Sequence, residues 1–177
     1  MSRTWWVRIP PLLLGRMVFG LLGVLWALRS LQSFAEPNFT DPETASDWVA
    51  VVTVSLALAL LPAGLALLDG LSRRRGRTFR VLLVVAALGA VTAAIANLVE
   101  DGMGVDAAGS VYYLSIVLMM VSMLALAGVL LSGRPRWPGL VVLGTLIGLI
   151  LLESGGGVLI LIAWGAAAIA VRPRTSS

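Results

Sequence analysis

The chain has 177 residues, of which 59% are hydrophobic and only 12% charged, with a net charge of +4 and a mean hydropathy of +0.97. A soluble domain carries about 25% charged residues, so this composition excludes an ordinary soluble fold and predicts an integral membrane protein. Cysteine, histidine and lysine are all absent, which excludes disulfides, histidine-based catalysis and Schiff-base chemistry. We therefore expect no cofactor and no metal, and we identify no catalytic residue. The exclusive use of arginine as the cation is typical of a GC-rich bacterial genome.

The N-terminal third of the chain predicts two membrane-spanning helices joined by an acidic loop. The first apolar segment covers about residues 11–33 and carries Arg29 near its far end. The second covers about residues 47–68. Thr44 or Ser46 is the expected N-cap of this second helix, because a hydroxyl there accepts a hydrogen bond from a free backbone N–H.

The segment that follows gives the clearest topological signal in the chain. Residues 72–80 hold five arginines, and short arginine-rich loops remain in the cytoplasm. This assignment places the N-terminus inside and the first loop outside. A third helix is predicted over about residues 81–100, with Gly102 as its C-terminal cap. Its alanine-rich face would allow close packing, so we expect it to be the central helix of the bundle.

The C-terminal half contains one clear helix and one ambiguous apolar segment. The fourth helix is predicted over about residues 110–131. The apolar segment 139–171 is either one long crossing, giving five helices, or a tight hairpin of two short ones, over about 138–153 and 156–171. Only the hairpin returns the two arginines of the C-terminal tail to the cytoplasm, so it is preferred.

Together these elements predict an all-α fold. We expect a polytopic transmembrane helical bundle of six helices, N-in/C-in, with residues 1–177 forming a single integral membrane domain in the cell membrane. In this topology every arginine except Arg29 lies on the cytoplasmic side, and every acidic residue except Asp69 on the outer side. The pair Gly144 and Gly148, spaced as in G-x-x-x-G, is expected to serve helix packing.

A candidate polar cluster lies near the outer end of the third helix. Asn97 is three residues before Glu100 and four before Asp101, so all three share one side of a helix. Arg29 is the only arginine near the outer surface, at about the same depth as Asn97. Three interpretations remain open: water-exposed interfacial carboxylates, a structural Arg29–Glu100 ion pair, or a site that binds a cation or a polar headgroup.

Three functional hypotheses follow. The first is a structural or accessory membrane protein whose partners are the lipid bilayer and, through small-residue helix faces, a second copy or another membrane protein. The second is a small transporter or channel-like protein with a polar site formed by Arg29, Asn97 and Glu100. The third is a lipid-active membrane enzyme. A nucleic-acid partner is not expected, since the arginines fall in predicted cytoplasmic loops.

Overall fold

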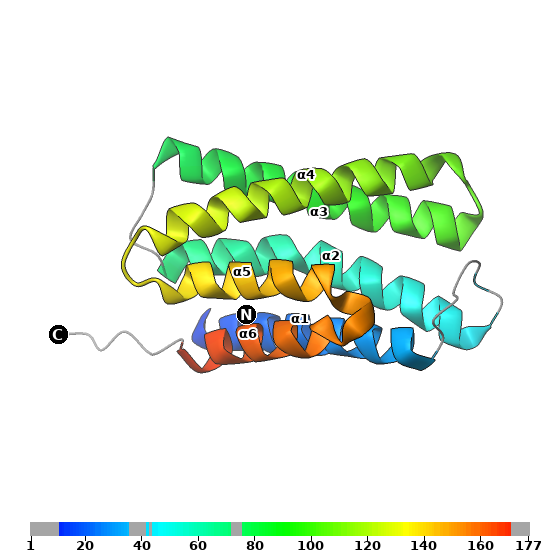
Figure 1. The fold of residues 1–177 in the computed structure, drawn as a ribbon, viewed down its shortest axis with the longest axis horizontal. Coiled ribbons are helices and arrows are strands. Elements are labelled where there is room, and N and C mark those ends of the chain that lie inside the picture. The colour runs from blue at the N-terminus through cyan, green and yellow to red at the C-terminus, as the bar shows by residue number, and fades with distance from the viewer. Residues whose placement is uncertain (1–10, 36–41, 43, 72–75, 171–177) are drawn as a thin grey trace, which may run out of the picture.

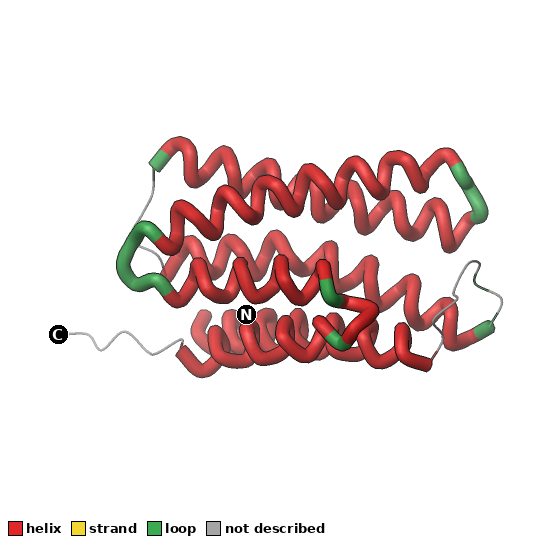
Figure 2. Tube along the Cα trace, viewed as in Figure 1, coloured by secondary structure: helices red, strands yellow, loops and turns green. Residues whose placement is uncertain are grey.

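A computed structural model describes residues 11–35, 42, 44–71 and 76–170, and within these ranges all the regular secondary structure is helical (Figures 1 and 2). The elements are α1 (Pro11–Ala35), α2 (Ala45–Leu71), α3 (Arg77–Met103), α4 (Ala107–Leu131), α5 (Trp137–Ile150), the short 3-10 helix η1 (Leu152–Ser154) and α6 (Gly156–Ala170). The predicted six-helix, all-α fold is confirmed, and each predicted helix overlaps its observed counterpart.

Four of these helices are long and apolar enough to cross a membrane. Helices α1 to α4 contain 25, 27, 27 and 25 residues. At 1.5 Å per residue they are about 37–40 Å long, which exceeds the roughly 30 Å of a bilayer's hydrocarbon core. Large apolar side chains face outward on all of them, where they contact lipid. The chain is therefore a multi-pass membrane protein.

The six helices form a closed ring in sequence order. Each helix packs against its neighbours in the chain, and α6 returns to pack against α1. The prediction that the third helix is central is therefore wrong: α3 packs against α2 and α4 as one member of the ring. Its small-residue face serves these pairwise contacts. A Cβ added at Gly89 would lie only 2.9 Å from the Ser115 carbonyl oxygen of α4, so α3 and α4 approach closely.

The middle of the ring is filled by large side chains. Trp164 of α6 is fully buried, and its ring lies 5.4 Å from that of Phe19 on α1. Its indole also lies next to Gly64 of α2, because a Cβ at Gly64 would be 2.9 Å from it. Trp164 thus crosses the interior from α6 to α2, two helices that are not neighbours in the ring. Other fully buried side chains around it are Leu22, Leu58, Leu61, Met119, Met123 and Ile160.

The C-terminal apolar segment forms the predicted hairpin. Gly155 adopts a positive φ of 92°, a conformation that favours glycine, and the Gly156 N–H donates to the Leu151 carbonyl at 2.8 Å. The Gly144 and Gly148 pair lies on the α5–α6 contact, since a Cβ at Gly148 would overlap Ile160. This G-x-x-x-G motif therefore packs the two arms of the hairpin together.

The hairpin is much shorter than the rest of the bundle. Helices α5 and α6 contain 14 and 15 residues, or about 21–22 Å each. Figure 1 shows the hairpin turning well before the ends of α3 and α4 on the right of the view. The end of the bundle where α1 and α3 finish, at Ala35 and Met103, is called the distal end. The end where α3 begins, at Arg77, is called the proximal end. The ring therefore has six helices proximally and four distally.

Two predicted helix caps have different outcomes. Thr44 caps α2 as expected: the Asp47 N–H donates to its Oγ1 at 3.3 Å, and the Thr44 N–H donates to the Asp47 carboxylate at 2.6 Å. The cap of α3 is Gly104, with φ of 67°, and not Gly102. The helix continues about one turn further than predicted, because the polar residues Glu100 and Asp101 do not end it. It ends where Gly104 adopts the left-handed conformation.

Replacing Gly157 with alanine is expected to destabilise the protein by about 1–3 kcal/mol, the usual cost of forcing extra atoms into a packed contact. Its Cβ would overlap the Trp26 carbonyl oxygen, which belongs to the rigid backbone of α1. Gly165→Ala on the same helix is the matched control, since a Cβ there meets no atom within 4 Å. Denaturant unfolding in detergent measures both variants. Equal stability of the two would contradict the α1–α6 contact.

Candidate functional site

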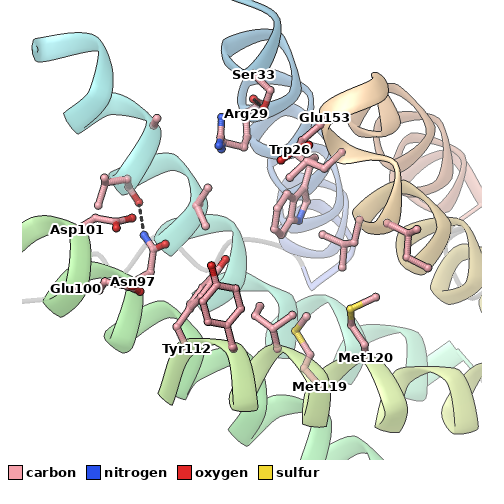
Figure 3. A pocket seen from close by; sticks show the side chains of 18 residues that line it. Trp26, Arg29, Ser33, Asn97, Glu100, Asp101, Tyr112, Met119, Met120 and Glu153 are labelled. Atoms are coloured by element: carbon pink, nitrogen blue, oxygen red, sulfur yellow. Dashed lines mark hydrogen bonds between the residues drawn. The ribbon is translucent and has the colours of Figure 1, made fainter. Parts of the chain in front are cut away.

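A cavity of about 620 Å³ lies near the distal end of the ring (Figure 3). It is bounded by α1, α2, α3, α4, the end of α5 and η1. The cavity exists because the short α5–α6 hairpin turns on its proximal side. At the level of the cavity, α5 and α6 therefore do not fill the space between the four longer helices. Leu149, Ile150 and Leu152 at the tip of the hairpin line it, together with Met119 and Met120 of α4.

Helix α3 contributes Asn97, Glu100 and Asp101 to one wall of this cavity. The prediction that these residues share a face is therefore confirmed. Asn97 is buried, and its Nδ2 donates to the Val51 carbonyl at 3.3 Å and to Ser55 Oγ at 3.1 Å, both on α2. The amide thus ties α3 to α2. Figure 3 shows its side-chain oxygen on the cavity side.

Glu100 lies between α3 and the first turn of α4. A Cβ added at Gly109 would overlap the Glu100 carboxylate, so the acid occupies the space that the absent side chain leaves. The residue is partly exposed and lines the cavity. Gly109 is buried, and its packing role is to admit a carboxylate next to the α4 backbone.

Helix α1 contributes the opposite wall with Trp26, Arg29 and Ser33. The Arg29 Nη1 donates to Ser33 Oγ at 2.9 Å, and Ser33 Oγ donates to the Arg29 carbonyl at 3.2 Å. Trp26 is 2% exposed, and its indole N–H has no acceptor within the part of the chain that the structure describes. This wall therefore carries hydrogen-bond donors and a positive charge.

The Arg29–Glu100 ion pair, one of the three interpretations left open by the sequence, is not formed among the described residues. The reason is architectural: α1 packs against α2 and α6, whereas α3 packs against α2 and α4, so the cavity separates their facing walls. That interpretation paired Arg29 with Glu100 because the two residues lie at similar depths in the membrane. Similar depth does not make their helices neighbours in the ring. Both residues instead line the same cavity, Arg29 from α1 and Glu100 from α3.

Several lining residues escaped the sequence-based prediction. Trp26 and Ser33 lie three residues before and four after Arg29, so helical spacing alone could have placed them beside it. Tyr112, on the first turns of the fourth predicted helix, lines the cavity from α4. Glu153 lines it from η1. Its position depends on the length of the hairpin, which the sequence left undetermined.

Charged side chains of both signs line this cavity. Among residues 11–35, 44–71 and 76–170, no group of three acidic side chains is placed to hold a metal ion. The chain as a whole contains no histidine, cysteine or lysine to act as a base or nucleophile. Comparison with protein-family models, curated proteins and solved structures found no match for this chain.

Proposed function

We propose that this multi-pass membrane protein binds a small charged or amphiphilic molecule in the distal cavity. The observation that supports the proposal is the cavity itself. A purely structural or accessory role predicts packed side chains between α1 and α3 at the level of Asn97, whereas about 620 Å³ of polar-walled space lies there. Concave sites with a few converging polar groups over apolar surface are the usual form of small-molecule sites.

The proposal concerns a binding site and not an open channel. Beneath the cavity, the ring interior is filled by side chains that are fully buried, including Leu58, Met123 and Trp164. A ligand that enters from the distal end therefore meets a closed floor. This arrangement fits a binding protein or a transporter whose site is accessible from one side only.

We further propose that the distal end faces outward from the cell membrane and that both termini are cytoplasmic. The proximal end carries Arg77 and Arg80 at the start of α3, and Arg134 and Arg136 in the α4–α5 connection. Arginines in short loops favour the cytoplasmic side.

Single cysteines test this orientation without background, because the chain has none of its own. A membrane-impermeant maleimide added to intact cells is expected to label Asp106→Cys, in the exposed distal loop, and not Thr78→Cys, in the exposed proximal turn of α3. Thr78→Cys should react only after the membrane is permeabilised. The reverse pattern would contradict the proposed orientation.

The same approach tests whether the cavity holds water. In lipid-free detergent, Met120→Cys lines the cavity and is expected to react with a charged, water-soluble methanethiosulfonate reagent. Val121→Cys, its neighbour on α4, is exposed on the outer apolar surface and is the matched control. We expect at least about 10-fold faster modification of Met120→Cys, since a thiol in hydrocarbon lacks the water needed to ionise and react. Equally slow modification of both would favour the structural role.

A further inference from the structure

We infer that the cavity holds the headgroup of a zwitterionic phospholipid that carries a primary amine, entering sideways from the distal leaflet. This inference rests on the proposed binding function and names the class of ligand. Four features of the cavity carry it: an open side, opposed charges, unused donors on one wall, and an apolar edge.

The open side lies between α1 and α4. In the ring these two helices are separated by α5 and α6, which close the interior proximally. Beyond the hairpin tip no helix among the described residues lies between α1 and α4, and two residues that line the cavity, Ile150 and Tyr113, are 69% and 68% exposed on the outer surface. Figure 1 shows the ends of α1 and α4 projecting past the hairpin. A molecule in the distal leaflet can therefore reach the cavity between α1 and α4 without crossing the plane of the distal loops.

Charges of both signs line the cavity. Arg29 extends from α1 with the acidic Glu153 of η1 on the same side, while Glu100 and Asp101 lie on α3 (Figure 3). A ligand with only one sign of charge would leave one wall uncompensated, at a cost in a partly enclosed site. A headgroup that contains both an anion and a cation satisfies both walls at once.

The α1 wall suits a phosphate. A guanidinium has five N–H donors, and within the described ranges Arg29 uses one of them for Ser33. Arginine binds phosphate oxygens through two parallel hydrogen bonds. The α3 wall suits a primary amine, because Glu100 and the Asn97 amide oxygen are acceptors that require N–H donors. A quaternary ammonium has no such donors and is recognised by surrounding aromatic faces instead.

The apolar edge indicates a lipid in preference to a soluble zwitterion. Ile150 lines the cavity at the hairpin tip and is also 69% exposed on the outer surface. Leu151 beside it is likewise exposed. The cavity therefore reaches the outer apolar surface at Ile150, where acyl chains lie. A headgroup can sit inside while its chains remain in the bilayer.

Native mass spectrometry of the detergent-purified protein tests this inference. Equimolar phosphatidylethanolamine, phosphatidylcholine and phosphatidylglycerol with identical chains are added, and the retained lipid is measured. We expect phosphatidylethanolamine to be retained about 10-fold more than phosphatidylglycerol, the factor that one charge-assisted contact supplies. Glu100→Gln should remove this preference, and Arg29→Gln should reduce retention of all three lipids. Arg77→Gln, an exposed arginine at the proximal end and outside the cavity, is the control for Arg29→Gln and should behave as the native protein.

A second measurement keeps all charged residues in place. Phosphatidylethanolamine should protect Met120→Cys from the water-soluble reagent, whereas glycerophosphoethanolamine, which lacks acyl chains, should not. Protection by the chain-free compound would overturn a lipid ligand, as would phosphatidylglycerol preference or retention unaffected by both variants. If the cysteine reacts and no lipid protects it, the lipid inference fails while the proposed binding function stands. If it is unreactive without lipid, both fail.

Discussion

Trp164→Ala is expected to destabilise the protein by about 3–5 kcal/mol, the typical cost of deleting a large aromatic side chain from a packed core. Trp164 is fully buried and fills the middle of the ring, in contact with Phe19 of α1 and beside Gly64 of α2. Residues on three helices, α1, α2 and α6, meet at this side chain, so the structure has little freedom to collapse into the hole. Denaturant unfolding in detergent, followed by circular dichroism, measures the loss.

Two further variants show which property of Trp164 stabilises the protein. One removes the indole N–H but keeps an aromatic ring, and the other removes a different tryptophan. The Trp164 indole N–H is buried with no acceptor in the described part of the chain. Trp164→Phe should therefore cost much less than Trp164→Ala, because it keeps most of the ring and removes an unsatisfied donor. Trp48→Ala, on the outer surface of α2, should cost less than about 1 kcal/mol. A large loss in Trp164→Phe would mean that the N–H has a partner.

Helix positions were predictable from the sequence because they depend on local chemistry. The predicted apolar spans, the α2 cap, which is Thr44, and the C-terminal hairpin all depend on nearby residues, and each was confirmed. The C-terminal cap of α3 was misassigned because Gly102 and Gly104 both fit the pattern. Only the backbone conformation, positive at Gly104, distinguishes them.

The arrangement of the helices was less predictable, because it depends on contacts between distant segments. The small face of α3 predicted close packing, which Gly89 and Ser115 confirm, but the same face fits a central helix or one in a ring. The interpretation with an Arg29–Glu100 ion pair was wrong because α1 and α3 are not neighbours in the ring. Depth along a helix follows from residue number, whereas the neighbours of a helix do not.

In the candidate site, the positions of residues along each helix were predictable, whereas the cavity between the helices was not. Asn97, Glu100 and Asp101 were placed correctly on one face by helical spacing, and Arg29 at the same depth. The cavity between them arises from a difference in length of more than ten residues between α3 and α5. A shorter hairpin in place of two full crossings converts what would be a packed interior into a space with polar walls. The hairpin thus provides the site without contributing most of its charges.

Filling this space should remove ligand binding without unfolding the protein. Ala50 lines the cavity from α2 and is buried, so Ala50→Trp directs an indole into the empty volume. Such a ring covers about 150–250 Å² of surface and, because α2 lies between α1 and α3 in the ring, obstructs a headgroup that must contact both. We expect phospholipid retention to be lost and modification of Met120→Cys to slow by at least about 10-fold. Stability should change by less than about 1 kcal/mol, because new apolar contacts are offset by the covering of polar groups.

The matched control for this variant is Val49→Trp, at the preceding position of α2. Val49 is 55% exposed on the outer surface, so the same indole there points into lipid and away from the cavity. It should leave both retention and cysteine modification as in the native protein. Binding that persists in Ala50→Trp at the native level would place the ligand outside the cavity. Equal loss in both variants would trace the effect to tryptophan on α2 and not to the filled volume.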